Sequence, residues 1–180
     1  MKTETQSTQQ PVVMDEDVLA LARRAFQHAR AGEAAQLAWM LGAGLPANLA
    51  NERGDTLLML ASYNGHLEAT QVLLDHGADP ERVNDRGQTP LAGAAYKGDV
   101  GMVRLLLEAG ARVDGAGPDG RTALMFAGMF DRLEVLEVLI ERGANPSHRD
   151  AARRTALDYA HAMGAQRTTE RLATARLGST

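Results

Sequence analysis

One stretch of the sequence has the glycine spacing of a phosphate-binding loop. Residues 115–120 read Gly-Ala-Gly-Pro-Asp-Gly, which fits the G-x-G-x-x-G pattern of dinucleotide sites. That pattern binds pyrophosphate only where the loop follows a buried strand and opens a helix, so that the helix N-terminus faces the phosphates. Here Gly120 stands 33 residues after Gly87 and 66 after Gly54, and Thr122 starts the next helix. We interpret these glycines as turn residues, and we expect no cofactor.

The histidines do not have the spacing of a metal site or of a catalytic group. No two of them stand four residues apart, the chain contains no cysteine, and no H-E-x-x-H, nucleophile-elbow or Walker motif occurs. We therefore expect no catalytic residue, no metal and no enzyme activity, although a catalytic site can also be assembled from residues scattered along a chain. The five histidines are His28, His66, His76, His148 and His161.

The same residue types return every 33 positions along most of the chain. Threonine, leucine, alanine and glycine each keep one position in this period, and a pair of large aliphatic residues keeps a fifth. Five columns with one period identify a repeat architecture, in which stacked units bury a continuous core. The columns are Thr56, Thr89, Thr122 and Thr155; Leu58, Leu91, Leu124 and Leu157; Ala61, Ala94, Ala127 and Ala160; Gly44, Gly77, Gly110 and Gly143; and residues 73–74, 106–107 and 139–140.

Each column has a physical reason in a unit of two helices. Thr89 followed by Pro90 is typical of a helix N-cap and first helical position. Gly65 fits a turn into a second helix, whose apolar residues share one face. Gly77 fits the left-handed residue that ends a helix, and the polar residues 84–87 that follow predict a hairpin-like loop.

These motifs resemble the ankyrin repeat. The resemblance is carried by residues 89–94 (Thr-Pro-Leu-Ala-Gly-Ala), 64–68 (Asn-Gly-His-Leu-Glu), 73–79 (Leu-Leu-Asp-His-Gly-Ala-Asp) and 85–89 (Asp-Arg-Gly-Gln-Thr), and it covers about 34–165. It implies an all-α solenoid of stacked helix–turn–helix units with hairpin-like loops, and a concave face lined by the first helices and the loop tips. Two departures are Asp131 and Arg153, which replace glycines of the pattern.

We expect a disordered tail over 1–14 and an ankyrin-repeat domain over 15–180, made of about five helical pairs with imperfect outer pairs that act as caps. The first pair is predicted over Asp15–Ala31 and Ala34–Gly42, with Trp39 in the same apolar column as Val72 and Leu105. A polar final helix is predicted over Arg167–Leu177.

Composition and charge narrow the classes of partner. A chain with a net charge of −4 does not attract nucleic acid, so we expect no nucleic-acid partner. We interpret the arginines of the last 32 residues as a solvated cap face rather than a nucleic-acid patch. No run of eighteen apolar residues and no signal peptide occurs, so we expect a cytoplasmic protein without a membrane segment. Only Lys2 and Lys97 are lysines, which is typical of a GC-rich bacterial gene. We expect a monomer.

Ankyrin arrays usually bind proteins through residues that vary between repeats, so we expect a protein partner at such positions. Three of the seven aromatic residues, Tyr63, Tyr96 and Phe130, lie in these columns, and aromatic residues and Met are enriched in interface cores. The alternative is that such residues fill the groove between repeats, as we expect of Phe126 and Tyr159. The predicted partner-binding residues are Tyr63, Asn64, Tyr96, Lys97, Met129 and Phe130, with Arg53, Arg86 and Asp119 at the loop tips.

We expect this surface to serve a non-catalytic interaction module, acting as an inhibitor, immunity or scaffold protein. The alternative is a small-molecule-binding or enzymatic accessory protein, for example in a stress response. A deep apolar pocket with perturbed carboxylates or histidines would favour that alternative. A shallow groove lined by Tyr, Met and Arg would favour the first.

Overall fold

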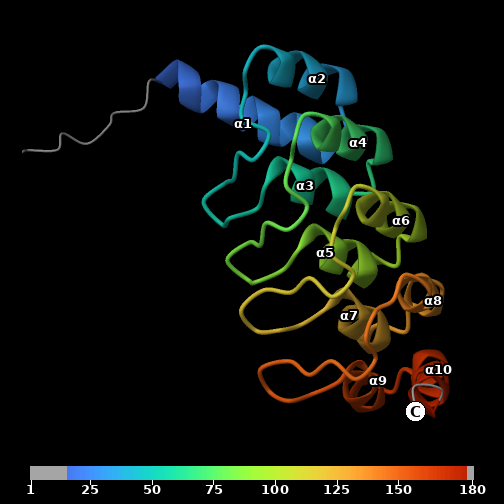
Figure 1. The fold of residues 1–180 in the computed structure, drawn as a ribbon. Helices are drawn as coiled ribbons and strands as arrows, with labels where there is room; N and C mark the ends of the chain where they lie inside the picture. Colours follow the sequence, from blue (N-terminus) through green and yellow to red (C-terminus); the bar gives the residue numbers. More distant parts are fainter. Residues whose placement is uncertain (1–15, 178–180) are drawn as a thin grey trace, which may run out of the picture.

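The computed structural model describes residues 16–177, and the side chains of residues 16–175, as five pairs of helices (Figure 1). The expected tail over 1–14 lies outside these residues. The first helices of the pairs are α1 (Glu16–Ala31), α3 (Leu57–Tyr63), α5 (Pro90–Lys97), α7 (Ala123–Met129) and α9 (Ala156–Met163). The second helices are α2 (Ala34–Gly42), α4 (Leu67–Asp75), α6 (Val100–Glu108), α8 (Leu133–Glu141) and α10 (Gln166–Leu177).

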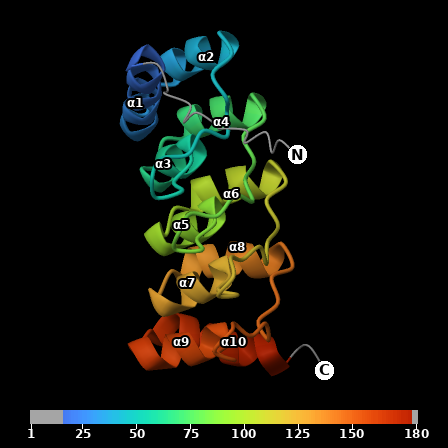
Figure 2. The ribbon, with the colours of Figure 1, turned by 90° about the vertical axis from the view of Figure 1, so that its left-hand side faces the viewer.

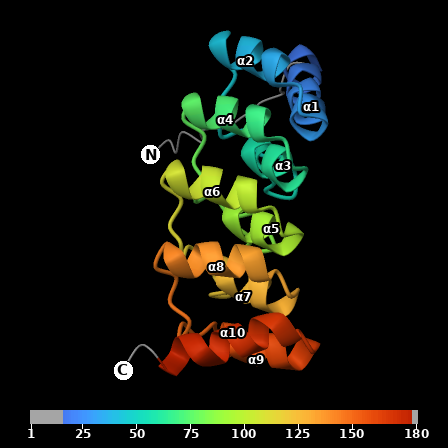
Figure 3. The same cartoon turned by 90° about the vertical axis from the view of Figure 1, so that its right-hand side faces the viewer.

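The pairs stack in chain order into an elongated, two-layered array. Figure 1 shows the first helices in one layer and the second helices in the other, with the long loops extending from the first-helix side. Figure 2 and Figure 3 show the same order from the two sides, from α1 and α2 at one end to α9 and α10 at the other. One apolar core runs through the stack, and in it Leu58, Leu91 and Leu124 are almost completely buried. The expected all-α solenoid is confirmed.

The repeated threonines begin the first helices. The hydroxyls of Thr56 and Thr89 each accept a hydrogen bond at 3.1 Å from the amide three residues later. Thr155 forms a capping box, because its backbone amide also donates to the carboxylate of Asp158. Such caps satisfy amides that the helix itself leaves without acceptors. Thr122 is buried but makes no such hydrogen bond.

The two residues that depart from the glycine pattern keep the backbone that glycine supplies elsewhere. Asp131 has φ of 54° and Arg153 has φ of 62°, both in the left-handed region that is costly for side chains with a Cβ atom. The carboxylate of Asp131 accepts hydrogen bonds from the amide and the hydroxyl of Thr168, at 3.0 and 3.2 Å. It thereby caps α10, whose N-terminal neighbour Ala165 has no side-chain oxygen.

The long loops pack against one another as a second stack beside the helices. The amide of Asp85 donates to the carbonyl of Arg53 at 3.1 Å, and the amide of Ala151 donates to the carbonyl of Asp119 at 2.9 Å. Gly117 approaches its neighbouring loop so closely that a Cβ atom there would lie 2.1 Å from the carbonyl oxygen of Gly87. Gly117 therefore lets two neighbouring loops pack together.

Candidate functional site

Three aromatic rings form a continuous row on the first-helix side of the array. The rings of Tyr63 and Tyr96 stack with centroids 6.2 Å apart and planes 12° apart. The ring of Phe130 meets that of Tyr96 edge to face, with centroids 4.6 Å apart. Both geometries are favourable for aromatic pairs. The row joins the ends of α3, α5 and α7. Tyr63 and Tyr96 lie side by side because they occupy equivalent positions of stacked repeats, and Phe130 joins them from the following position.

The row remains accessible along its length. Tyr63 is 44% exposed, and Tyr96, Met129 and Phe130 are half-buried. Lys97 is exposed, and its ammonium group lies 5.0 Å from the centroid of the Tyr63 ring, within reach of a cation–π interaction. Tyr96 contacts Phe130 edge to face, although the repeat period places Met129 in the column of Tyr96.

A hollow of about 450 Å³ opens beside the two tyrosines. Its floor includes Gly93, whose equivalents in the other repeats are the larger residues Leu60, Phe126 and Tyr159. A Cβ atom on Gly93 would already touch the Tyr63 ring at 3.4 Å, so the missing side chain makes room here. The sequence contained this signal, because Gly93 breaks a column of large residues, but we did not predict the hollow.

The next two repeats fill the equivalent space. Phe126 and Tyr159 are buried, as expected of groove-filling residues. The guanidinium of Arg121 lies 5.3 Å from the Phe126 ring centroid, and that of Arg154 lies 4.4 Å from the Tyr159 ring centroid. These arginines cover the rings that replace the hollow.

The predicted loop-tip residues differ in how they are placed. Arg53 and Arg86 are exposed and line the hollow beside the tyrosines. Asp119 is half-buried and pairs with Arg121 at 2.5 Å within its own loop. The structure thus brings the two arginines next to Tyr63 and Tyr96, whereas the carboxylate of Asp119 is occupied inside its repeat.

A second hollow, of about 730 Å³, lies between α1 and the first long loop. Its apolar lining includes Leu19, Phe26 and Leu49, and Arg53 lines both this hollow and the one beside the tyrosines. We did not predict it from the sequence. The available signal was the length of α1, since its 16 residues make it about twice as long as the other first helices.

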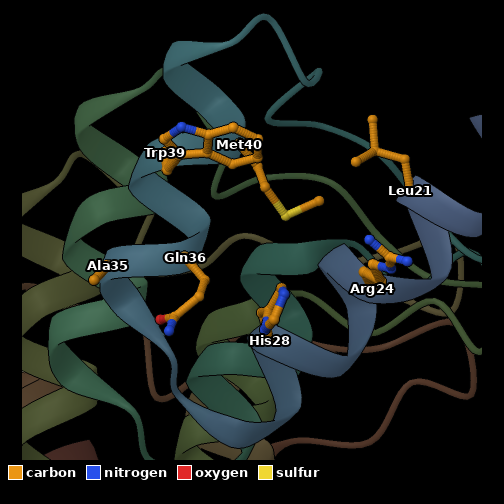
Figure 4. A pocket seen from close by; sticks show the side chains of 7 residues that line it. All are labelled: Leu21, Arg24, His28, Ala35, Gln36, Trp39 and Met40. Atoms are coloured by element: carbon orange, nitrogen blue, oxygen red, sulfur yellow. The ribbon is translucent and has the colours of Figure 1, made fainter.

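A third hollow, of about 350 Å³, lies between α1 and α2 at the end of the stack, where Leu21, Arg24 and Met40 line it beside Trp39 (Figure 4). Trp39 was expected to be apolar packing in the column of Val72, but it is 72% exposed. The physical reason is its place in the first pair, because no earlier described helix covers the outer side of α2.

Two of the histidines make hydrogen bonds within the first helices and their connections. The ring Nε2 of His66 lies 2.8 Å from the carbonyl oxygen of Arg30, and His28 bonds Glu33. Between residues 16 and 177, no cluster of three or more His, Asp or Glu side chains is arranged to hold a metal ion.

A buried carboxylate lies beneath the last loop. The Tyr159 hydroxyl donates to Asp150 at 2.5 Å, and Arg154 lies 3.7 Å from the same carboxylate. Burial alone would raise the pKa of Asp150, but the hydrogen bonds from Tyr159 and the Arg154 amide, together with the Arg154 charge, hold it below its ordinary value. This group faces the protein interior and lies away from the tyrosine hollow.

The arginines near the C-terminus are largely paired with carboxylates. Arg167 pairs with Glu134 at 2.7 Å, and Arg171 pairs with Glu137 at 2.7 Å. The Arg149 guanidinium donates to the carbonyl of Arg153. These pairs join α8 to α10 and support the interpretation of a solvated cap face.

None of the helices between residues 16 and 177 has the length and apolarity needed to cross a membrane.

Comparison with known proteins agrees with this architecture. A family model of three consecutive ankyrin repeats matches residues 25–116, and a single-repeat model matches residues 119–151. The chain is 48% identical over 59 residues to a protein of Pseudomonas aeruginosa that is named as an ankyrin repeat protein. That match covers 33% of this chain and about a third (34%) of the relative's length. Ankyrin repeats are generally protein–protein interaction modules. The sequence columns, the stacked helical pairs and the matched models together place this chain in the ankyrin-repeat family.

Proposed function

We propose that this chain is a non-catalytic binding module whose partner protein docks on the first-helix side of the array. The observation that carries the proposal is the accessible row of Tyr63, Tyr96 and Phe130 beside an open hollow. Partly exposed aromatic residues next to a concavity are the usual anchors of a protein interface. Met129 extends the apolar surface, and Asn64, Lys97, Arg53 and Arg86 provide polar contacts around it. Asp119 is left out of the proposed surface because its carboxylate is paired.

The manner of action we propose is coverage of a partner's surface by a single copy of the chain, as an inhibitor, immunity or scaffold protein. No specific observation favours a small-molecule or enzymatic role. The hollow beside the tyrosines is lined by polar and apolar groups and opens to solvent, and the Asp150–Tyr159 pair lies elsewhere.

The test is the double variant Tyr63→Ala/Tyr96→Ala in the full chain, used as bait in the source cell. Loss of a hot-spot aromatic residue typically costs about 2 kcal/mol or more of binding. We therefore expect partners captured by the wild type to be lost, while the circular dichroism spectrum keeps its helical form and the variant stays folded at the temperature of the assay.

The matched control is Trp39→Ala, which removes an exposed aromatic residue from the second-helix layer. It should leave capture unchanged. If the tyrosine variant keeps every wild-type partner while folded, or if only the Trp39 variant loses them, the proposed surface is wrong.

A further inference from the structure

Two hollows adjoin along the N-terminal half of the first-helix side, and we call them together the N-terminal groove. One part lies over Gly93 between Tyr63 and Tyr96, and the other lies between α1 and the first long loop. Arg53 lines both parts, so the two hollows adjoin at that residue. It has apolar contact points in both parts, provided by Leu60 and the tyrosines in one and by Leu19, Phe26 and Leu49 in the other.

The N-terminal groove carries a charge opposite to that of the whole chain. Four arginines line it against two carboxylates, whereas the chain has a net charge of −4. One of those carboxylates, Asp55, is mostly buried; it accepts a hydrogen bond from the side-chain amide of Asn84 at 2.9 Å and lies 3.6 Å from the Arg53 guanidinium. The lining arginines are Arg23, Arg30, Arg53 and Arg86, and the carboxylates are Glu52 and Asp55.

The charges around the groove are of both signs. Lys97 adds a positive charge over the face of Tyr63, and the exposed Asp85 adds a negative charge near Gly54, although its side chain lines neither hollow. A concave surface with one prevailing sign of charge focuses the electrostatic potential and attracts ligands of the opposite sign. The exposed guanidinium groups of Arg53 and Arg86 are suited to bidentate contacts with carboxylates.

The C-terminal half of the same side differs in its chemistry. There Phe126 and Tyr159 occupy the position of Gly93, and Arg121 and Arg154 lie over these rings and pair with Asp119 and Asp150. Those arginines are engaged within their own repeats. Arg53 likewise lies 3.6 Å from Asp55 in its own repeat, so the feature that distinguishes the N-terminal half is the open hollow, which Arg53 and Arg86 line.

From these observations we infer that the partner contributes an acidic segment with apolar anchors, and that this segment lies along the N-terminal groove. Its carboxylates pair with Arg53 and Arg86 at the junction of the two hollows. Its larger apolar side chains enter the space over Gly93 and the space beside Phe26. The inference rests on the proposed protein-binding function and adds the chemistry of the partner.

The experiment selects displayed random peptides of about 12 residues, which span up to roughly 40 Å when extended, on the full wild-type chain. Enriched peptides should combine Glu or Asp with Phe, Leu or Met. Their affinity, measured by fluorescence anisotropy, should fall as salt is raised from about 50 to about 500 mM, because salt screens exposed charges.

Two variants locate the binding. Arg53→Gln/Arg86→Gln should weaken the selected peptides about tenfold. Gly93→Leu, which introduces the residue type of the equivalent position 60, should weaken them similarly by filling the hollow. The charge-matched control Arg104→Gln/Arg142→Gln, on the second-helix layer, should change affinity less than twofold. Melting temperatures establish that each variant is folded.

The outcomes separate the inference from the proposed function. If no peptide is enriched, if the enriched peptides are basic or neutral, or if they bind the Arg53/Arg86 variant as tightly as wild type, the acidic-segment inference is overturned. A captured partner that depends on Tyr63 and Tyr96 but ignores both arginines would leave the protein-binding function standing without the inference. A captured partner whose binding depends on neither the tyrosines nor the arginines would contradict both the proposed binding surface and the acidic-segment inference.

Discussion

At the scale of single residues, the same departure from the repeat pattern has two different energetic outcomes. Asp131 and Arg153 both hold a left-handed backbone that glycine holds in the other repeats. The cost of the left-handed backbone at Asp131 is offset by the hydrogen bonds that its side chain accepts from Thr168 in the next repeat. Arg153 is exposed, and its hydrogen bonds are made by its backbone amide and carbonyl. Its side chain therefore does not offset the strain of the left-handed backbone.

This difference predicts opposite effects of one substitution. Arg153→Gly should stabilise the protein by about 0.5–1 kcal/mol, because relief of a left-handed conformation exceeds the entropy that glycine adds to the unfolded chain. Asp131→Gly gains the same relief but loses the cap of α10, which is worth about 1 kcal/mol, so it should be neutral or destabilising. Urea unfolding followed by circular dichroism measures both. Equal stabilisation by the two variants would contradict this account.

At the scale of elements, the helices followed from the sequence more fully than the loops and hollows did. The threonine, glycine and aliphatic columns predicted helical pairs, and even the imperfect first pair was predicted to within a residue of α1 and α2. A helix end depends on residues within one turn, which a sequence displays directly. The hollow over Gly93 and the exposure of Trp39 depend on which side chains meet between neighbouring repeats, whereas the pairing of Asp119 with Arg121 forms within one loop and depends on the conformation of that loop. A local pattern does not encode those contacts.

Packing between loops leads to a prediction at Gly117. The substitution Gly117→Ala would place a methyl group against the carbonyl of Gly87, so the two loops would have to separate. We expect a loss of about 1–3 kcal/mol of stability, the range found for overpacked sites. Gly42→Ala is the control, since a Cβ atom there meets no neighbour within 4 Å. Thermal unfolding of both variants measures the difference, and equal melting temperatures would refute close loop packing.

At the scale of the whole molecule, the array is held together by contacts between neighbouring pairs. The interior pairs pack against a pair on each side, whereas the pairs α1–α2 and α9–α10 each have one neighbouring pair among the described residues (Figure 1). In such linear arrays stability is close to a sum of unit and interface contributions. The end pairs therefore open at lower free energy than the interior ones.

Native-state hydrogen exchange measures this gradient. We expect amides of α6 to exchange more slowly than amides of α2 and α10, after correction for the intrinsic rate of each amide. The proposed groove is lined by residues of α1, α3 and α5, so a bound acidic peptide should slow exchange preferentially in these three helices. Uniform protection from α2 to α10 would indicate one all-or-none unit instead.

The exposure of Trp39 has a spectroscopic consequence for anyone who follows the folding of this protein. It is the only tryptophan in the chain, and its indole faces water in the folded state. Its emission therefore resembles that of an unfolded chain already before denaturation, and intrinsic fluorescence hardly records the melting of the repeats. The same indole is instead a local reporter at one end of the array, sensitive to a quencher or to a molecule that covers the space between α1 and α2.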